Sequence, residues 1–458
     1  MSTKGKALSV FTLMMINVIA VDSLRTLPIS AEYGSSLIFY YIVAAIGFFI
    51  PTALVTAELA TGWPNTGGAY VWVTKAFGPK TGFLAIWLQW IYNVVWYPTI
   101  LAFLAGTLAT LINPTLANNT TYTLSIILIL FWVSTLLSCM GIKISSRFSV
   151  LGAIVGTMIP ILVIIFLGLM WVMNGHVSQV HFDKASLFPH LNNLDNLGYL
   201  VAVLFGLVGM EMSAVHAGDV KNPQKDYPRA LLYSSLIILV TLIGGSLAIA
   251  IVIPPNQISL VSSLIDAYAI FFKAHQWVWA VPVMVAMIFL SGLANMSAWV
   301  IGPTRGLWVA AEEGNISRYF AKLNSKGMPS RILILQAVIV TLLCAVFLLM
   351  PSVNSSYWIL TALTSQLALL FYILFFAAAI RLRYSSPEVK RSYRIPGGKI
   401  GIWFVAGIGI LTSIGVIALG FLPPTNLQIA SNELYELILA AGILLFSLPP
   451  FFIRRGKK

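Results

Sequence analysis

Charged residues are scarce in this chain of 458 residues. They make up only 9% of the sequence, whereas hydrophobic residues make up 59% and the mean hydropathy is +0.91. A soluble domain carries roughly 25% charged residues, so this composition excludes an ordinary soluble protein. The apolar runs are also longer than the ~10 residues of a membrane β-strand. The composition therefore predicts an all-α integral membrane protein.

Several chemical signatures are missing as well. The two cysteines, Cys139 and Cys344, lie inside apolar runs, which favours core packing over a disulfide or a metal site. The five histidines form no cluster with ligand spacing, and no phosphate-binding loop of the form GxxxxGK(S/T) is present. We therefore expect no enzymatic activity, no cofactor, no metal and no ATP-driven transport.

What the sequence does contain is a series of apolar segments. Polar, Pro-rich and Gly-rich stretches divide the chain into twelve of them, each about the 20 residues that a membrane helix needs. Their approximate bounds are 7–29, 36–60, 83–112, 122–141, 148–173, 194–217, 229–253, 277–302, 331–350, 356–380, 401–422 and 434–453.

Basic residues account for the formal net charge of +13 and flank the segments almost entirely on one side. Only Lys184 and Lys273 lie on the other side, and Arg25 lies within the first segment. The positive-inside rule then predicts a multi-pass protein of the cell (inner) membrane with both termini in the cytoplasm. Because the charges form short flanks and no single stripe, they also argue against nucleic acid as a partner.

Four ionisable residues lie within or at the ends of segments, where burial in a membrane is costly unless a partner or a cavity is present. Asp22 and Arg25 are three residues apart, close enough for a structural ion pair or for a joint role in lining a pathway. Glu58 lies near the end of the second segment, where a structural and a gating role are equally compatible with the sequence. Glu211 lies deep in the sixth segment.

Two glycines precede Glu211 in the sixth segment. Gly206 and Gly209 weaken a helix and permit an unwound stretch, which within a membrane is tolerated where it lines a cavity or is buried in protein. Close packing of helices through small residues is the alternative. The first and sixth segments each open one half of the chain, and interrupted segments at corresponding positions indicate a transporter with inverted repeats.

Seven short motifs, in this order, give the chain a family resemblance over nearly its whole length. The motifs are 57–61 (AELAT), 67–73 (GGAYVWV), 209–211 (GME), 222–228 (NPQKDYP), 299–306 (WVIGPTRG), 395–399 (IPGGK) and 421–424 (FLPP). With these motifs the chain resembles the amino acid/polyamine/organocation (APC) transporter superfamily, and within it the bacterial glutamate/GABA antiporter group.

The resemblance implies a LeuT-like fold of twelve helices with helices one and six unwound. Residues 1–380 would form a ten-helix core with inverted repeats over about 7–173 and 194–380, and residues 381–458 would hold helices eleven and twelve and a short basic tail. It also implies a substrate site built by Ile19, Ala20, Val21, Asp22, Ser23, Phe205, Gly206, Val208, Gly209, Asn295, Trp299 and Tyr372.

Gating or proton sensing is then expected of Glu211, Asp22, Arg25 and Glu58. The chain departs from the family where the first segment has no glycine at residues 20–23 and gains a carboxylate, and where Asn295 replaces an acidic residue. Both changes alter the charge of the pocket, so the substrate need not be glutamate or GABA.

We expect an amino acid antiporter that works by alternating access in the lipid bilayer, with a homodimer left open as its assembly. A proton- or sodium-coupled amino acid symporter is the alternative on the same fold. An amino-acid-sensing transceptor is the alternative of another class.

Overall fold

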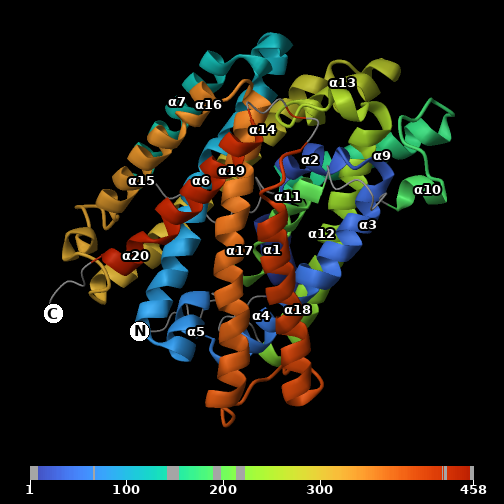
Figure 1. Cartoon of the computed structure of the whole chain (residues 1–458). Coiled ribbons are helices and arrows are strands. Elements are labelled where there is room, and N and C mark those ends of the chain that lie inside the picture. The colour runs from blue at the N-terminus through green and yellow to red at the C-terminus, as the bar shows by residue number, and fades with distance from the viewer. Residues whose placement is uncertain are drawn as a thin grey trace.

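The computed structural model of this chain describes residues 9–64, 68–141, 154–188, 197–212, 222–424, 427 and 431–453. Every regular element in these ranges is helical, and Figure 1 shows long helices packed side by side in one bundle. The prediction of an all-α membrane protein is therefore confirmed.

Ten helical stretches of the described residues are long and apolar enough to cross a membrane. They are Gly34–Gly62, Pro79–Ile112, Thr120–Cys139, Ile154–Met173, Lys225–Val252, Ala280–Glu312, Ser330–Leu349, Val353–Ser385, Gly398–Leu419 and Asn432–Phe452. An eleventh crossing arises if the bent pair Val10–Val21 and Leu24–Ala31 forms one span. The predicted segment 194–217 contains the apolar stretch Leu197–Met212, which is helical only in part, and it continues outside the described residues, so the count of twelve stays a prediction.

Several of these stretches are built from more than one helix. The N-terminal part holds α1 (Val10–Val21), α2 (Leu27–Ala31), α3 (Leu37–Ala44), α4 (Ile50–Gly62), α5 (Gly68–Phe77), α6 (Pro79–Ile112), α7 (Thr120–Cys139) and α9 (Ile159–Met173). The middle holds α10 (Lys184–Leu187), α11 (Leu200–Phe205), α12 (Pro223–Val252), α13 (Ser263–Ala274) and α14 (Ala280–Glu312). The last part holds α15 (Ser330–Leu343), α16 (Val346–Leu349), α17 (Val353–Ser385), α18 (Gly398–Leu419), α19 (Asn432–Ser447) and α20 (Pro449–Phe452).

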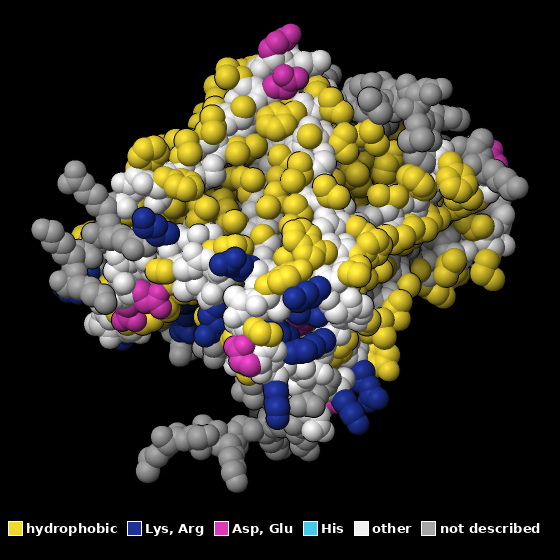
Figure 2. Space-filling model, turned by 60° about the horizontal axis from the view of Figure 1, so that its bottom comes forward, with side chains coloured by type: hydrophobic (Ala, Val, Ile, Leu, Met, Phe, Trp, Pro, Cys, Tyr) yellow, Lys and Arg dark blue, Asp and Glu magenta, His cyan; other side chains and the backbone are white. Residues whose placement is uncertain are grey.

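Helices α6 and α17 form the centre of the bundle. They pack on each other and are buried along most of their length, whereas α7, α18 and α19 turn large apolar side chains such as Ile129, Leu411 and Leu437 outward. In a membrane that outer surface meets lipid. Figure 2 shows a nearly continuous hydrophobic surface, with Lys and Arg side chains gathered at the end that is turned forward.

Apart from the four-residue α10, two helices were not expected from the sequence, because each is short and amphipathic. Helix α13 buries Leu264, Tyr268 and Phe271 on one face, a spacing of four and three residues that fits a helix lying against the bundle. Helix α5 contains Lys75 and connects α4 to α6. A search for long apolar segments finds neither.

Some of the basic residues from which the orientation in the membrane was predicted lie outside the described residues. The basic residues outside them are Lys4, Lys6, Lys143, Arg147, Lys221, Arg454, Arg455, Lys457 and Lys458, and Gly67 of the second motif is outside them as well.

Candidate functional site

The first site element is a break in the helical chain after α1. Helix α1 ends at Val21, and Asp22 and Ser23 adopt extended backbone angles, with φ −72° and ψ 108° for Asp22 and φ −124° and ψ 117° for Ser23. The chain then resumes in a short 3-10 turn and α2, bent by 41° from α1. The last carbonyls of α1 consequently lack helical partners. The amide of Asn295, on α14, lies 3.5 Å from the carbonyl oxygen of Ile19 and donates to it.

The second site element is a break after α11. This helix ends at Phe205, and residues 206–209 form a turn and a non-helical stretch in which Gly209 has φ +123°. A Cβ atom on Gly209 would lie 3.2 Å from the carbonyl oxygen of Ala20. The two breaks therefore touch each other, and glycine permits both the backbone angle and the close approach.

Two small cavities adjoin the breaks. The larger has a volume of about 40 Å³ and the smaller about 20 Å³, which is room for a few water molecules. The larger is lined by Ala20, Val21, Ser23, Arg25, Thr26, Tyr92, Asn93, Trp96, Phe205, Gly206, Val208, Asn295 and Trp299. The smaller is lined by Asp22, Ser23, Leu24, Arg25, Ile100, Phe103, Thr157, Ile288, Ser291, Gly292 and Asn295.

Asp22 is 1% exposed and has one described hydrogen-bond partner. The hydroxyl of Thr241, on α12, donates to its Oδ2 at 2.7 Å, whereas Oδ1 is buried without a partner among the described residues. The free energy of burying a carboxylate is high unless it is paired or hydrogen-bonded. Asp22 is thus half satisfied and faces the smaller cavity.

Arg25 is 2% exposed and lies at the border of both cavities. Its Nη1 donates to the hydroxyl of Tyr357 at 3.2 Å, and its guanidinium carbon lies 5.1 Å from the ring centre of Phe205 and 5.7 Å from that of Trp96. The Nε atom has no partner in the described part of the chain. Aromatic faces stabilise a cation but leave the directed N–H donor available.

Glu211 lies behind the second break and does not line either cavity. The hydroxyl of Tyr372, on α17, donates to its Oε2 at 2.5 Å and accepts a hydrogen bond from the amide of Gly209 at 3.1 Å. Tyr372 also packs on Phe48, with ring centres 4.9 Å apart. One hydroxyl therefore connects α17 to the last residue of the non-helical stretch and to Glu211 just beyond it.

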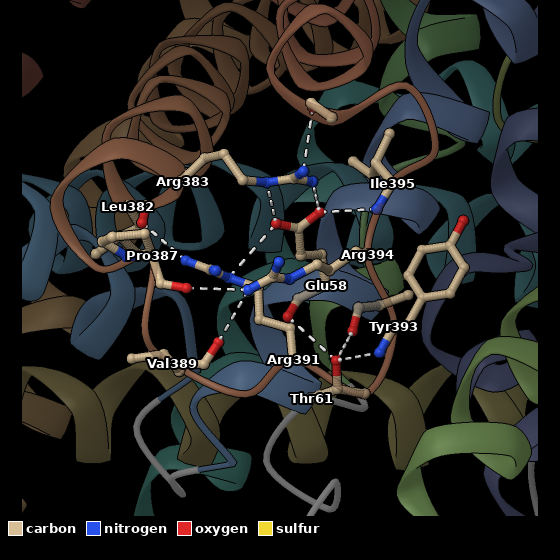
Figure 3. A network of polar contacts seen from close by, with 12 residues as sticks. Glu58, Thr61, Leu382, Arg383, Pro387, Val389, Arg391, Tyr393, Arg394 and Ile395 are labelled. Atoms are coloured by element: carbon tan, nitrogen blue, oxygen red, sulfur yellow. Dashed lines mark hydrogen bonds and ion pairs between the residues drawn. The ribbon is translucent and has the colours of Figure 1, made fainter.

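Glu58 lies elsewhere, in the network shown in Figure 3. It is 2% exposed and accepts hydrogen bonds from Nε of Arg383 at 2.8 Å, from Nη2 of Arg383, and from the amide of Ile395 at 2.9 Å. Nε of Arg391 lies 3.5 Å from its Oε1. These contacts join α4 to the end of α17 and to the connection that leads into α18.

The structure brings most of the sequence-predicted residues together and separates a few. Asp22, Arg25 and the predicted residues of the larger cavity share one region, whereas Ile19 and Gly209 contribute backbone, Tyr372 supports Glu211, and Glu58 is in the separate network. Asp22 and Arg25 form no ion pair with each other, so of the two readings of the sequence the structural ion pair is not observed.

Sequence analysis did not single out the partners of these residues. Tyr92 lines the larger cavity, Thr241 and Tyr357 hold Asp22 and Arg25, and Arg383 and Arg391 hold Glu58. A polar residue in an otherwise apolar helix is the available signal for Thr241 and Tyr357, but this signal names no partner.

Fold and site together define a class of protein. The chain is a multi-pass membrane protein whose broken helical segments lie beside buried charges and small cavities, which is an arrangement found in secondary transporters. It has none of the clusters of three or more His, Cys, Asp or Glu that could hold a metal ion in the described residues.

Comparison with known proteins agrees with this class. The family profile described as amino acid permease matches residues 7–446. An uncharacterized transporter of Legionella pneumophila is 54% identical over 99% of this chain and 98% of its own length. A glutamate/gamma-aminobutyrate antiporter of Lactococcus lactis subsp. cremoris is 30% identical over 98% of this chain and 90% of its own length. A cadaverine/lysine antiporter of Escherichia coli is 26% identical over 79% of each chain.

The chain therefore belongs to the amino acid permease family, within the APC superfamily, and is a transporter rather than an enzyme. Its substrates are of the amino acid or polyamine kind, and the recognition made from the seven motifs is confirmed.

Proposed function

We propose that this protein is an amino acid antiporter of the cytoplasmic membrane that exchanges one substrate for another by alternating access. The observation that carries the proposal is the contact between the two chain breaks, where Gly209 approaches Ala20 beside two cavities whose linings include Arg25 and Asp22. Broken helices of this kind present unpaired backbone groups to charged substrates in secondary transporters. The names of the relatives from Lactococcus and Escherichia, both antiporters, support exchange.

The proposed architecture has twelve spans in the LeuT-like arrangement. Residues 1–380 form the core, with inverted repeats over about 7–173 and 194–380, and 381–458 add the last two helices. The helices of the first and sixth segments are unwound at the site. The basic flanks support cytoplasmic termini by the positive-inside rule. The proposal does not depend on whether the protein forms a homodimer.

The proposed binding groups are the backbone of residues 19–23 and 205–209. The carbonyls at the end of α1 favour the ammonium of an amino acid, and amide groups at the start of a helical segment favour its carboxylate. Phe205, Val208, Asn295 and Trp299 supply side-chain contacts. Tyr372 acts by holding the second break in place.

The proposed gating elements are Glu211, Glu58, Asp22 and Arg25. Glu211, with Tyr372, would link the occupancy of the cavity to the position of α17. Glu58 would fix α4 to the end of α17 while that end of the molecule is closed. Asp22 and Arg25 border the cavities themselves. Because the cavities hold only a few waters, loading requires these contacts to loosen on one side at a time.

The test is uptake of labelled amino acids into proteoliposomes at about pH 5.5 and 7.5, with and without an internal amino acid pool and with no ion gradient. An antiporter takes up label strongly only into preloaded vesicles. Uptake into empty vesicles that appears only with a proton or sodium gradient would replace exchange by symport. Specific binding with no flux in any arm would favour a transceptor.

A further inference from the structure

Asp22 and Arg25 are two buried, opposite charges that do not neutralise each other. They are three residues apart, but each bonds to a different helix, Asp22 to Thr241 on α12 and Arg25 to Tyr357 on α17. Each keeps one buried polar atom with no described partner, the acceptor Oδ1 of Asp22 and the donor Nε of Arg25. A stable fold that buries such atoms usually leaves them for water or a ligand.

Both unpaired atoms belong to residues that line the same cavity. Asn295 lines it too, and its Oδ1 is a second buried acceptor without a partner in the described residues. The free groups are thus two acceptors, one of them charged, and one charged donor. This set matches an ammonium, which donates up to three hydrogen bonds, next to a carboxylate, which only accepts.

The charge inventory of the site is balanced. Among the described residues that line the two cavities, Asp22 is the one anion and Arg25 the one cation. Glu211 lies outside this lining and is held by Tyr372. A bound molecule with a net charge would leave an uncompensated charge in the buried site, which is strongly unfavourable, whereas a molecule with one charge of each sign would not.

We propose that Asp22 and Arg25 determine substrate specificity by selecting a zwitterion without net charge, with its carboxylate at Arg25 and its ammonium at Asp22 and Asn295. This inference rests on the proposed transport of amino acids. It narrows the substrate class, because the named relatives include an antiporter for glutamate and γ-aminobutyrate and one for cadaverine and lysine. Arg25 is then the residue that rejects diamines, since these carry two cations and no carboxylate.

The first experiment measures binding rather than transport. The purified full-length protein in detergent is titrated at pH 7 with three zwitterions (L-alanine, L-glutamine and γ-aminobutyrate), one anion (L-glutamate) and two cations (L-lysine and putrescine). We expect at least one zwitterion to bind at least tenfold more tightly than every charged probe. Tighter binding of a charged probe, or no binding of any zwitterion, overturns the proposal.

Two substitutions should shift the selectivity in opposite directions. Arg25→Gln leaves Asp22 as the only charge, so it should weaken zwitterion binding at least tenfold and strengthen putrescine binding. Asp22→Asn leaves Arg25 as the only charge, so it should weaken zwitterion binding and strengthen L-glutamate binding relative to wild type. Arg25→Lys keeps the charge and should keep the preference for zwitterions over putrescine.

Arg331→Gln is the matched control. This arginine stacks on Tyr319, lines neither cavity and belongs to a segment that we propose to be cytoplasmic. It should leave the selectivity unchanged. If Arg25→Gln does not fold, Asp22→Asn is sufficient by itself to test whether the balance of the two charges selects the substrate. An unchanged order of probe affinities in a folded variant overturns the proposal.

The binding experiment and the vesicle experiment test the two proposals independently. Zwitterion-selective binding without exchange would overturn the proposed antiport and keep the role of Asp22 and Arg25. Exchange that prefers charged substrates would keep the antiport and overturn that role.

Discussion

Tyr372 donates a hydrogen bond to Glu211 at 2.5 Å and thereby links α17 to the chain beyond the second break. The same hydroxyl accepts from the amide of Gly209 at 3.1 Å. Gly209 also lies against Ala20, so a short series of contacts connects α17 to both breaks. In the proposed mechanism this is how a change at the centre of the bundle reaches the substrate site.

Tyr372→Phe removes the hydroxyl that bonds to the amide of Gly209 and to Oε2 of Glu211. An unsatisfied buried group costs about 1–3 kcal/mol. We expect the exchange rate in proteoliposomes to fall at least about tenfold, which corresponds to ~1.4 kcal/mol. Tyr319→Phe is the control, because Tyr319 is exposed and its hydroxyl has no described bond. Equal exchange rates for the two variants would contradict a role for the hydroxyl.

Gly209→Ala should damage the contact between the breaks. The new Cβ would lie 3.2 Å from the carbonyl oxygen of Ala20, at a backbone φ of +123° that non-glycine residues adopt at a cost of about 1–3 kcal/mol. We expect a lower melting temperature in detergent and weaker substrate binding. Gly407→Ala, in α18, meets nothing within 4 Å and should keep or raise the melting temperature, because alanine favours a helix. Two variants with the same melting temperature and affinity would contradict the close approach.

Glu58→Gln should destabilise the end of the bundle drawn in Figure 3. The change leaves the buried guanidinium of Arg383 without its anion, and breaking a buried ion pair from one side costs about 3–5 kcal/mol. We expect a clear drop in melting temperature. Arg383→Gln should give a similar drop in melting temperature. The drop in the double variant should be smaller than the sum of the two single drops, because the residues share one interaction.

The control for this pair is Glu433→Gln, an exposed acidic residue in the first turn of α19. Its carboxylate favours the helix N-terminus by only about 0.3–1 kcal/mol. If Glu58→Gln lowers the melting temperature no more than Glu433→Gln does, the network does not stabilise the fold.

Asn295→Asp tests the charge of the cavity without changing its shape. The new carboxylate would line the same small cavity as Asp22, giving the lining two anions and one cation. We expect weaker binding of L-alanine, L-glutamine and γ-aminobutyrate and stronger binding of L-lysine at pH 7. Asn295→Ser, which adds no charge, should leave the order of the probes as in wild type. Identical orders for the Asp and Ser variants would speak against charge selection.

The orientation can be tested at two lysines on opposite sides of the predicted membrane. Lys390 lies in the connection between α17 and α18, and Lys273 lies in the last turn of α13. In intact cells, an impermeant thiol reagent should label Lys273→Cys and leave Lys390→Cys unlabelled until the membrane is opened. The parent chain for this measurement replaces Cys139 and Cys344 by alanine. Reversed labelling would place the termini outside the cytoplasm.

Local patterns decided the class of this protein and many of its candidate residues. Apolar length alone predicts most of the spanning helices, because an isolated membrane helix must satisfy its backbone internally and needs about 20 apolar residues to do so. The rarity of charge at membrane depth made Asp22, Arg25 and Glu211 conspicuous in the sequence, and the seven motifs indicated the family, which the comparisons confirmed.

Only the tertiary structure decided what these residues contact. Asp22 bonds to Thr241 and Arg25 to Tyr357, hundreds of residues away, although the two charges are neighbours in the sequence. Glu58 likewise meets Arg383 across the bundle. Hydropathy and helical periodicity describe one helix at a time, whereas pairing between buried charges depends on how several helices pack. For that reason the sequence indicated where the charged residues lie, and the fold determined that Asp22 and Arg25 bond to different helices and do not pair with each other.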